Sequence, residues 1–220
     1  MDVYKTEEEQ LDSIKKWLKE NSASIAVVVM AIVGFFGGRA YWQSYQNTHN
    51  ETTYEAFASV SELRDTALTD SANDTAFQVY VTSVDDLKVQ KPDHALTDLA
   101  VLKVAADFAE KGLWDDAESE LRWLKEQQTE PALEALVVYR LAQVLFQKEQ
   151  YDQALVLIAN AIEQDDDYLP RLKELQGDIY IEQGQLSKAL QTYKDASTAH
   201  SDTGLTSPAL QWKIDDLTGA

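Results

Sequence analysis

The residues best suited to chemistry in this 220-residue chain are its three histidines and its many carboxylates. His49, His94 and His200 lie far apart in the sequence, and no two of them have the spacing at which neighbouring ligands bind one zinc ion. The acidic run Asp165 to Asp167 has the charge for calcium, but it lacks the spaced ligands and the closing glutamate of a calcium loop. A solvated loop explains it better, and we expect no metal site.

Enzymatic chemistry has little support either. The chain contains no cysteine, which excludes thiolate ligands, disulfides and cysteine nucleophiles. It contains no nucleophile elbow and none of the glycine-rich loops that bind phosphates or dinucleotides. Scattered carboxylates on an acidic chain do not single out a general acid. We therefore expect a protein that is not an enzyme and needs no cofactor.

The charge of the chain indicates which partners it avoids. There are 38 acidic residues against 19 basic ones, giving a formal net charge of −19. Such a surface repels the phosphates of nucleic acids, so we expect no nucleic-acid partner. The hydrophobic content of 45% is ordinary for a globular protein and is sufficient to form a core.

One segment near the N-terminus is uncharged for long enough to cross a membrane. No residue of 21–38 carries a charge, and the run is rich in isoleucine, valine and phenylalanine. Continued to Trp42, the segment has about the 20 residues that a bilayer requires. Arg39, Tyr41 and Trp42 are suited to a membrane interface, where an arginine reaches the headgroups and aromatic rings are favoured. We expect one transmembrane anchor over residues 22–42, in contact with the lipid bilayer.

The basic residues beside this segment predict its orientation. Upstream, the chain has Lys15, Lys16 and Lys19, whereas after Arg39 the next basic residue is Arg64. Because lysine and arginine are retained on the cytoplasmic side, the N-terminus is expected in the cytoplasm and the large domain outside.

Residues 1–21 have the pattern of a cytoplasmic amphipathic helix. Thr6 and Glu9 form a capping box at its start, and acidic residues in its first turn and lysines in its last match the helix dipole. Its apolar stripe includes Leu11, Ile14 and Leu18.

A cleaved signal peptide is the alternative explanation of the apolar segment. Gly38 and Ala40 fit the positions before a cleavage site, and cleavage there would release a soluble repeat protein. An amphipathic helix upstream is more than a signal peptide needs, so the uncleaved anchor is favoured.

Residues 54–220 are expected to form one helical repeat domain. The polar stretch 43–53 before it is either a flexible tether or an extension of the membrane helix. Repeats are expected near 93–128, 131–165 and 170–200, followed by a capping helix over 207–218 that begins at an N-cap serine, Ser207.

The three repeats align through small residues, large residues and turns. A small residue recurs in each first helix (Ala105, Ala142, Gly177) and an alanine in each second helix (Ala117, Ala154, Ala189), with Gly112, Glu149 or Gly184 in the turn between them. Small residues let two antiparallel helices approach closely. The pattern resembles the tetratricopeptide repeat and predicts an all-α solenoid behind one transmembrane helix.

In the tetratricopeptide fold the first helices line a concave groove, which is where partners are expected. By register, the groove would present Leu136, Tyr139, Gln143 and Gln147 in the middle repeat and Arg171, Glu174, Asp178 and Glu182 in the last one. Such a surface suits extended or basic peptide segments. A merely solvated face is the competing explanation and remains open.

The order of parts is more specific than the repeat alone. The cytoplasmic helix, the anchor ending in "RAYW" and the closing helix "SPALQWKIDDL" together resemble the ancillary SecYEG translocon subunit family of Gram-negative bacteria along essentially the full chain. The resemblance implies a single-pass inner-membrane protein with periplasmic repeats, acting as a non-catalytic scaffold that presents them to chaperones or emerging exported chains.

The resemblance also implies particular partners. These are the SecYEG translocon and a membrane-anchored periplasmic chaperone of the prolyl-isomerase type. An alternative role for such a protein is that of a tethered regulatory adaptor, whose cytoplasmic helix restrains a stress-response regulator through the face that includes Leu11, Ile14 and Leu18.

Overall fold

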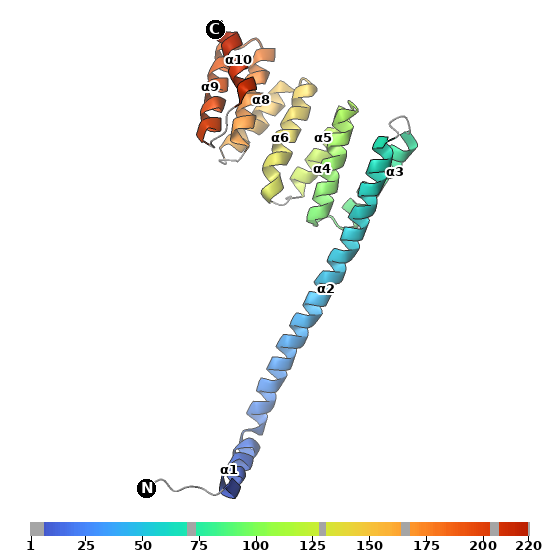
Figure 1. Cartoon of the computed structure of the whole chain (residues 1–220), viewed down its shortest axis with the longest axis vertical. Helices are drawn as coiled ribbons and strands as arrows, with labels where there is room; N and C mark the ends of the chain where they lie inside the picture. The colour runs from blue at the N-terminus through green and yellow to red at the C-terminus, as the bar shows by residue number, and fades with distance from the viewer. Residues whose placement is uncertain (1–6, 70–73, 128–130, 164–167, 203–206, 220) are drawn as a thin grey trace. The chain divides into compact units, whose positions relative to one another are not determined.

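The structure, a computed structural model, describes the backbone of residues 7–69, 74–127, 131–163, 168–202 and 207–219. Each regular element in these ranges is an α-helix (Figure 1). In chain order the helices are α1 (Glu7–Glu20), α2 (Ser22–Thr69), α3 (Asp74–Gln90), α4 (Ala95–Glu110), α5 (Trp114–Glu126), α6 (Pro131–Gln147), α7 (Tyr151–Ile162), α8 (Leu169–Glu182), α9 (Leu186–Asp202) and α10 (Pro208–Thr218). The described chain is all-α, as the sequence predicts.

The chain divides into two compact units, Met1–Thr52 and Thr53–Ala220. In the first unit, Asn21 is the single residue between α1 and α2. The helix α2 is continuous, so the stretch 43–53, for which a tether and a helix extension were both open, is helical.

The transmembrane anchor expected over residues 22–42 stays a prediction. In the part of the chain that the structure describes, no helix is long and apolar enough to cross a membrane. The side chains of residues 22–29, which begin the expected anchor, lie outside the described residues, as does Thr6 of the expected capping box. The side chains from Met30 to Trp42 are exposed.

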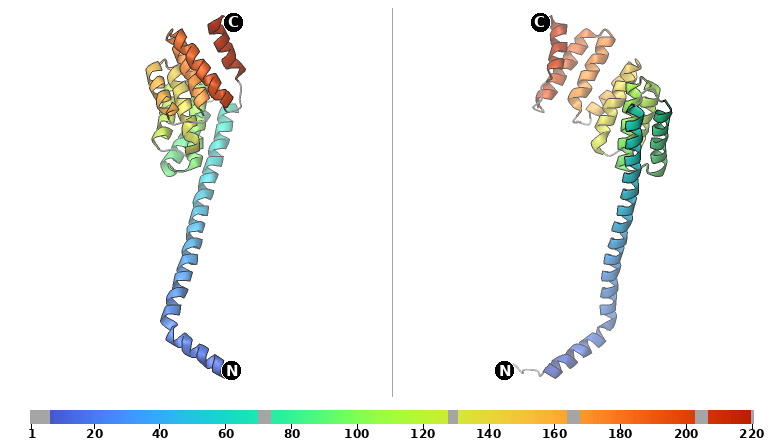
Figure 2. Two further views of the ribbon diagram at one scale, coloured as in Figure 1. Left: turned by 90° about the vertical axis from the view of Figure 1, so that its left-hand side faces the viewer. Right: turned by 45° about the vertical axis from the view of Figure 1, so that its right-hand side comes forward.

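The second unit is a stack of helix pairs. Within it, α4 packs on α5, α6 on α7 and α8 on α9, and each pair contacts the next (Figures 1 and 2). One apolar core, of buried residues from Val60 to Ile179, runs continuously through α2 to α8. The unit is therefore a tetratricopeptide-like solenoid, in which each pair buries its apolar face against its neighbours.

Small residues bring the two helices of each pair close together. The alanines at these positions are buried in all three repeats, and so is Gly177. The approach at Gly177 is the tightest, because a Cβ atom added there would lie 2.3 Å from Cε1 of Tyr193. The tyrosine ring fills the space that a side chain at position 177 would take, so the smallest residue faces a very large one.

The turn inside each repeat contains one residue with positive φ. These residues are Gly112, Glu149 and Gly184, with φ angles of 73°, 59° and 70°. They occupy the same position of the aligned repeats. Glycine adopts this left-handed conformation readily, whereas a residue with a Cβ atom is strained in it, so the middle repeat is strained at its turn.

The helix α10 closes the C-terminal end of the stack. The Oγ atom of Ser207 accepts a hydrogen bond from the backbone amide of Leu210 at 3.3 Å, which confirms the expected N-cap. Leu210 and Ile214 are buried together with Ala189 and Tyr193 of α9. The apolar end of the last repeat is thereby covered.

A buried carboxylate joins the N-terminal part of the second unit. Asp107 on α4 has no exposed side-chain surface, and Arg64 on α2 donates to both of its oxygens, from Nε at 2.7 Å and from Nη2 at 2.6 Å. The hydroxyl of Tyr80 on α3 donates to Oδ2 of the same carboxylate at 3.0 Å. Burial, aided by the negative charge of Asp107, raises the pKa of Tyr80, so the hydroxyl keeps its proton and remains a donor.

Replacing Arg64 by Met is expected to destabilise the second unit by about 3 kcal/mol, because Asp107 would be left buried without its cation. Urea unfolding followed by circular dichroism measures this change. Tyr80→Phe, which removes a single hydrogen bond, should cost about 1 kcal/mol. An Arg64→Met variant as stable as the parent chain would contradict this account of the buried carboxylate.

Replacing Glu149 by Gly is expected to stabilise the chain by about 0.5–1 kcal/mol, since relief of the strained turn exceeds the added entropy of the unfolded chain. Thermal unfolding measures it as a higher Tm. The matched control is Gly184→Ala, which introduces strain at the equivalent turn and should lower Tm. If both changes moved Tm in the same direction, the strain at residue 149 would be unimportant.

Candidate functional site

The expected partner-binding residues on α6 are partly engaged in internal contacts. Leu136, Tyr139 and Gln143 are half-buried, and Gln147 is exposed. The side-chain amide of Gln143 donates to the hydroxyl oxygen of Tyr139 at 3.0 Å. The ring of Tyr139 lies 5.6 Å from that of Tyr168, centroid to centroid. The structure therefore brings an aromatic pair and amide groups together here, which is chemistry suited to an extended peptide backbone.

The expected acidic groove on α8 already holds a cation of the same chain. The Nζ atom of Lys213 on α10 donates to Oε1 of Glu174 at 2.9 Å and to Oδ1 of Asp178 at 2.6 Å. Arg171 and Glu182, the other two expected groove residues, are exposed and make no hydrogen bond or ion pair with other described residues. The four residues thus separate into a neutralised pair and two solvated side chains.

Hydrogen bonding keeps Lys213 charged in this position. Burial acts to lower the pKa of Lys213, but the bonds to Asp178 and Glu174 outweigh it and raise the pKa. Burial, together with a 2.7 Å hydrogen bond to Asp178, also raises the pKa of Tyr193, so its hydroxyl stays a donor. A basic peptide would have to displace Lys213 to reach these carboxylates.

Among the described residues, Lys213 is one of three lysines that each donate to two carboxylates and connect neighbouring helix pairs. We call these contacts the lysine bridges. Lys88 on α3 reaches Asp85 and Glu120, and Lys148, in the turn after α6, reaches Asp115 and Glu118. In each bridge at least one of the carboxylates belongs to an adjacent helix pair. The bridges therefore neutralise part of the acidic surface where the repeats meet.

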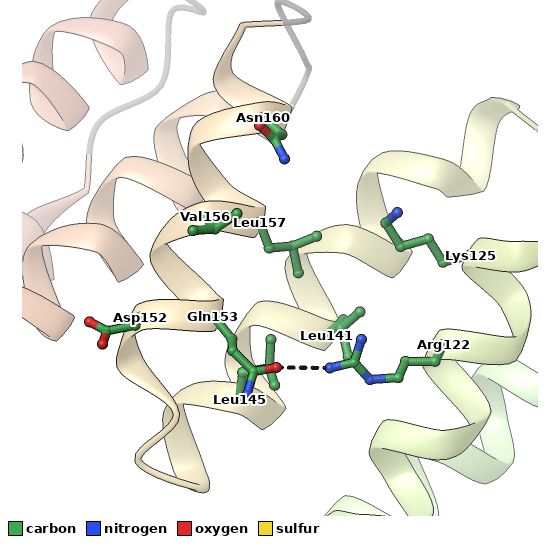
Figure 3. A pocket seen from close by; sticks show the side chains of 9 residues that line it. All are labelled: Arg122, Lys125, Leu141, Leu145, Asp152, Gln153, Val156, Leu157 and Asn160. Carbon is green, nitrogen blue, oxygen red and sulfur yellow. Dashed lines mark hydrogen bonds between the residues drawn. The ribbon is translucent and has the colours of Figure 1, made fainter.

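A pocket of about 400 Å³ lies between α5, α6 and α7, and none of the expected groove residues lines it (Figure 3). It is lined from α5, α6 and α7 by Arg122, Lys125, Leu141, Leu145, Asp152, Gln153, Val156, Leu157 and Asn160. Leu141 and Leu145 are buried behind it, whereas Val156 is 63% exposed. Apolar walls with a few polar groups around them are usual in ligand pockets.

Polar side chains surround this pocket and connect α5 with α7. The Nη2 atom of Arg122 donates to Oε1 of Gln153 at 3.2 Å, the dashed contact of Figure 3. Lys125 and Asn160 make no hydrogen bond or ion pair within the described chain. The pocket was not predicted from the sequence, although the unbroken apolar run 154–159 indicates that α7 has an apolar side beyond its core face.

The expected site residues of the first unit lie on two helices. Leu11, Ile14 and Leu18 on α1 are exposed, and so are Arg39, Tyr41 and Trp42 on α2. Large apolar side chains in water are unfavourable, so both groups are candidates for contact with lipid or protein.

The histidines do not form a site in the described part of the chain. No group of three or more histidines and carboxylates among the described residues is placed to hold a metal ion. His94 is the N-cap of α4, where its Nδ1 atom accepts a hydrogen bond from the backbone amide of Leu96 at 3.1 Å. Its role is therefore structural, and the side chain of His49 lies outside the described residues.

The sequence of the chain is similar to those of known proteins. A family model described as "Tetratricopeptide repeat-like domain" matches residues 15–219. Among the relatives that carry the name "Ancillary SecYEG translocon subunit" are two from different bacteria. One, from Neisseria gonorrhoeae, is 27% identical over 99% of this chain and 100% of its own length. The other, from Aggregatibacter actinomycetemcomitans, is 31% identical over 86% of this chain and 88% of its own.

A solved structure is also similar, at a lower level. The crystal structure of the P58(IPK) TPR domain is 12% identical, covers 97% of this chain and 69% of its own, and superposes with a TM-score of 0.46. The chaperone and the response regulator implied by the sequence resemblance have no counterpart in the relatives' names and stay predictions.

Replacing Lys213 by Met is expected to lower the stability of the second unit by about 1 kcal/mol, because Glu174 and Asp178 would face each other without a cation. The pKa of Lys213 is raised, so its contribution is complete at neutral pH and is lost only as the pH rises above the ordinary lysine range. Thermal unfolding at low and high salt measures the effect, which salt should reduce. Lys194→Met, at an exposed position of α9, is the control; equal losses in the two variants would show that the bridge contributes nothing.

Proposed function

Because the chain belongs to the family of ancillary SecYEG translocon subunits and has a tetratricopeptide repeat-like domain over residues 15–219, we propose that it is a non-catalytic, membrane-anchored scaffold at the SecYEG translocon. The observation that carries this proposal is the near full-length match, which includes the apolar segment as well as the repeats. A repeat solenoid with a packed core and large open faces suits protein binding.

The anchor is the first part of the proposal. The segment 21–38 has no charge, and its described side chains from Met30 onward are exposed large apolar groups or small residues. In a bilayer these side chains would be covered by lipid, and Arg39, Tyr41 and Trp42 would lie at the interface. We assign the N-terminus to the cytoplasm and the repeats to the periplasm, on the inner membrane.

The repeat domain supplies the second part. The aromatic and amide groups of Tyr139, Gln143 and Gln147 suit an extended segment, such as that of an emerging exported chain or of a chaperone. The acidic pair on α8 is a weaker candidate, since Lys213 already binds it. The pocket beside Val156 offers a separate surface for the same class of partner.

A pull-down from native membranes in mild detergent, through a C-terminal tag on the full chain, tests the proposal. We expect a bait with the mass of the full chain, 24.7 kDa, plus that of the tag, together with translocon subunits identified by mass spectrometry. A bait that lacks its first residues, up to Ala40, and brings no membrane proteins would overturn the scaffold at the translocon.

Surface variants of the same bait locate the binding face. Gln147→Glu on α6 is expected to reduce partner recovery several-fold if the partner binds the first helices, and Val156→Glu if it binds the pocket. Val89→Glu is the matched control, since Val89 is an exposed valine on α3. If both test variants recovered as much partner as the control does, neither the first helices nor the pocket would be the binding face.

A further inference from the structure

The apolar face of α1 is uncovered in the structure. Ile14 is 55% exposed and Trp17 58%, and Leu11 and Leu18 are exposed to a similar degree. At 100° per residue, Leu11, Ile14 and Leu18 form one stripe along the helix. Four large apolar side chains on one short helix are a cost in water that contact with a bilayer or a protein would remove.

The residues at the edges of this stripe are those of a helix that lies in a membrane interface. By the same helical geometry, Trp17 lies on one edge of the stripe and Lys15 and Lys19 lie on the other. Tryptophan favours the headgroup layer, and lysines there extend their charges to anionic lipid. On the opposite side of the helix, the exposed side chains of Lys16 and Glu20 form an ion pair, with 4.0 Å between Nζ of Lys16 and Oε1 of Glu20.

The joint between α1 and α2 leaves no linker. The backbone amide of Asn21 donates to the carbonyl oxygen of Trp17 at 2.9 Å, and its side-chain amide donates to the same oxygen at 2.9 Å. The uncharged segment begins at this residue. If the segment enters the bilayer, the C-terminal end of α1 lies at the membrane surface, and no part of α1 can be farther from the surface than the helix is long.

We propose that α1 lies along the cytoplasmic surface of the membrane, with Leu11, Ile14 and Leu18 at the boundary between headgroups and acyl chains and with Lys15 and Lys19 on anionic headgroups. This inference rests on the proposed membrane anchor. It identifies what covers the stripe and takes the stripe out of reach of a soluble regulator.

The absence of cysteine makes a direct test available. Single cysteines are introduced into the full-length chain as Ile14→Cys in the stripe, Lys16→Cys on the opposite side and Val33→Cys in the anchor, and each is labelled with a nitroxide. The proteins are reconstituted in vesicles of phosphatidylcholine and phosphatidylglycerol. Electron paramagnetic resonance then measures the accessibility of each label to oxygen, which enters the bilayer, and to a water-soluble nickel chelate.

We expect the label at residue 14 to be accessible to oxygen and protected from nickel, and the label at residue 16 to show the reverse. Vesicles without phosphatidylglycerol, or the change of Lys15 and Lys19 to Gln, should shift the label at residue 14 toward higher nickel accessibility. That shift would attribute the contact to anionic lipid.

Equal nickel accessibility at residues 14 and 16, with residue 33 protected, would overturn the inference and leave the anchor intact. Nickel accessibility at residue 33 as well would overturn the anchor itself. Protection of residue 14 in native membranes but not in lipid vesicles would also overturn the inference, in favour of a protein partner on this face.

Discussion

The solenoid depends on one carboxylate that has no contact with water. Asp107 is held by both nitrogen donors of the Arg64 fork and by the hydroxyl of Tyr80, so three helices meet at a single charged group. A carboxylate is stable in such a place only if its oxygens are fully engaged by a cation and other donors. The requirement for correct geometry fixes how α2 and α3 lie on α4. Each later helix pair packs on the one before it, starting from this arrangement.

Elsewhere in the solenoid, a few lysines reduce the repulsion among the many carboxylates. The chain has twice as many acidic as basic residues, and repulsion among them opposes compaction. Lysine bridges place single ammonium groups between two carboxylates where repeats meet, which offsets repulsion at positions where it would separate the helices. The remaining carboxylates can stay solvated, and they keep the outer faces of the solenoid free of nonspecific anionic ligands.

Local and periodic features of the fold could be predicted from the sequence. The N-cap at Ser207 depends on a neighbour three positions away, and the small residues at the close approaches of helices recur at the same position of each repeat; the structure agrees with both. The contact between Arg64 and Asp107 joins residues 43 positions apart, and the periodic pattern of apolar residues does not predict it. Similarly, α8 alone suggests a free acidic face, because the lysine that neutralises Glu174 comes from a helix 39 positions later. The pocket beside Val156 escaped prediction because it depends on three helices at once.

The boundaries between repeats are not held together in the same way. Lysine bridges connect α3 with α5, the turn after α6 with α5, and α10 with α8. Among the described residues, no ion pair joins the pair α6–α7 to the pair α8–α9, and the contact there includes buried apolar side chains and the rings of Tyr139 on α6 and of Tyr168, the residue before α8. Ions screen charges, whereas apolar contact weakens on cooling. Salt should therefore loosen the solenoid unevenly, at the boundaries with lysine bridges and not between the pair α6–α7 and the pair α8–α9, whereas cooling weakens the apolar core that runs from α2 to α8.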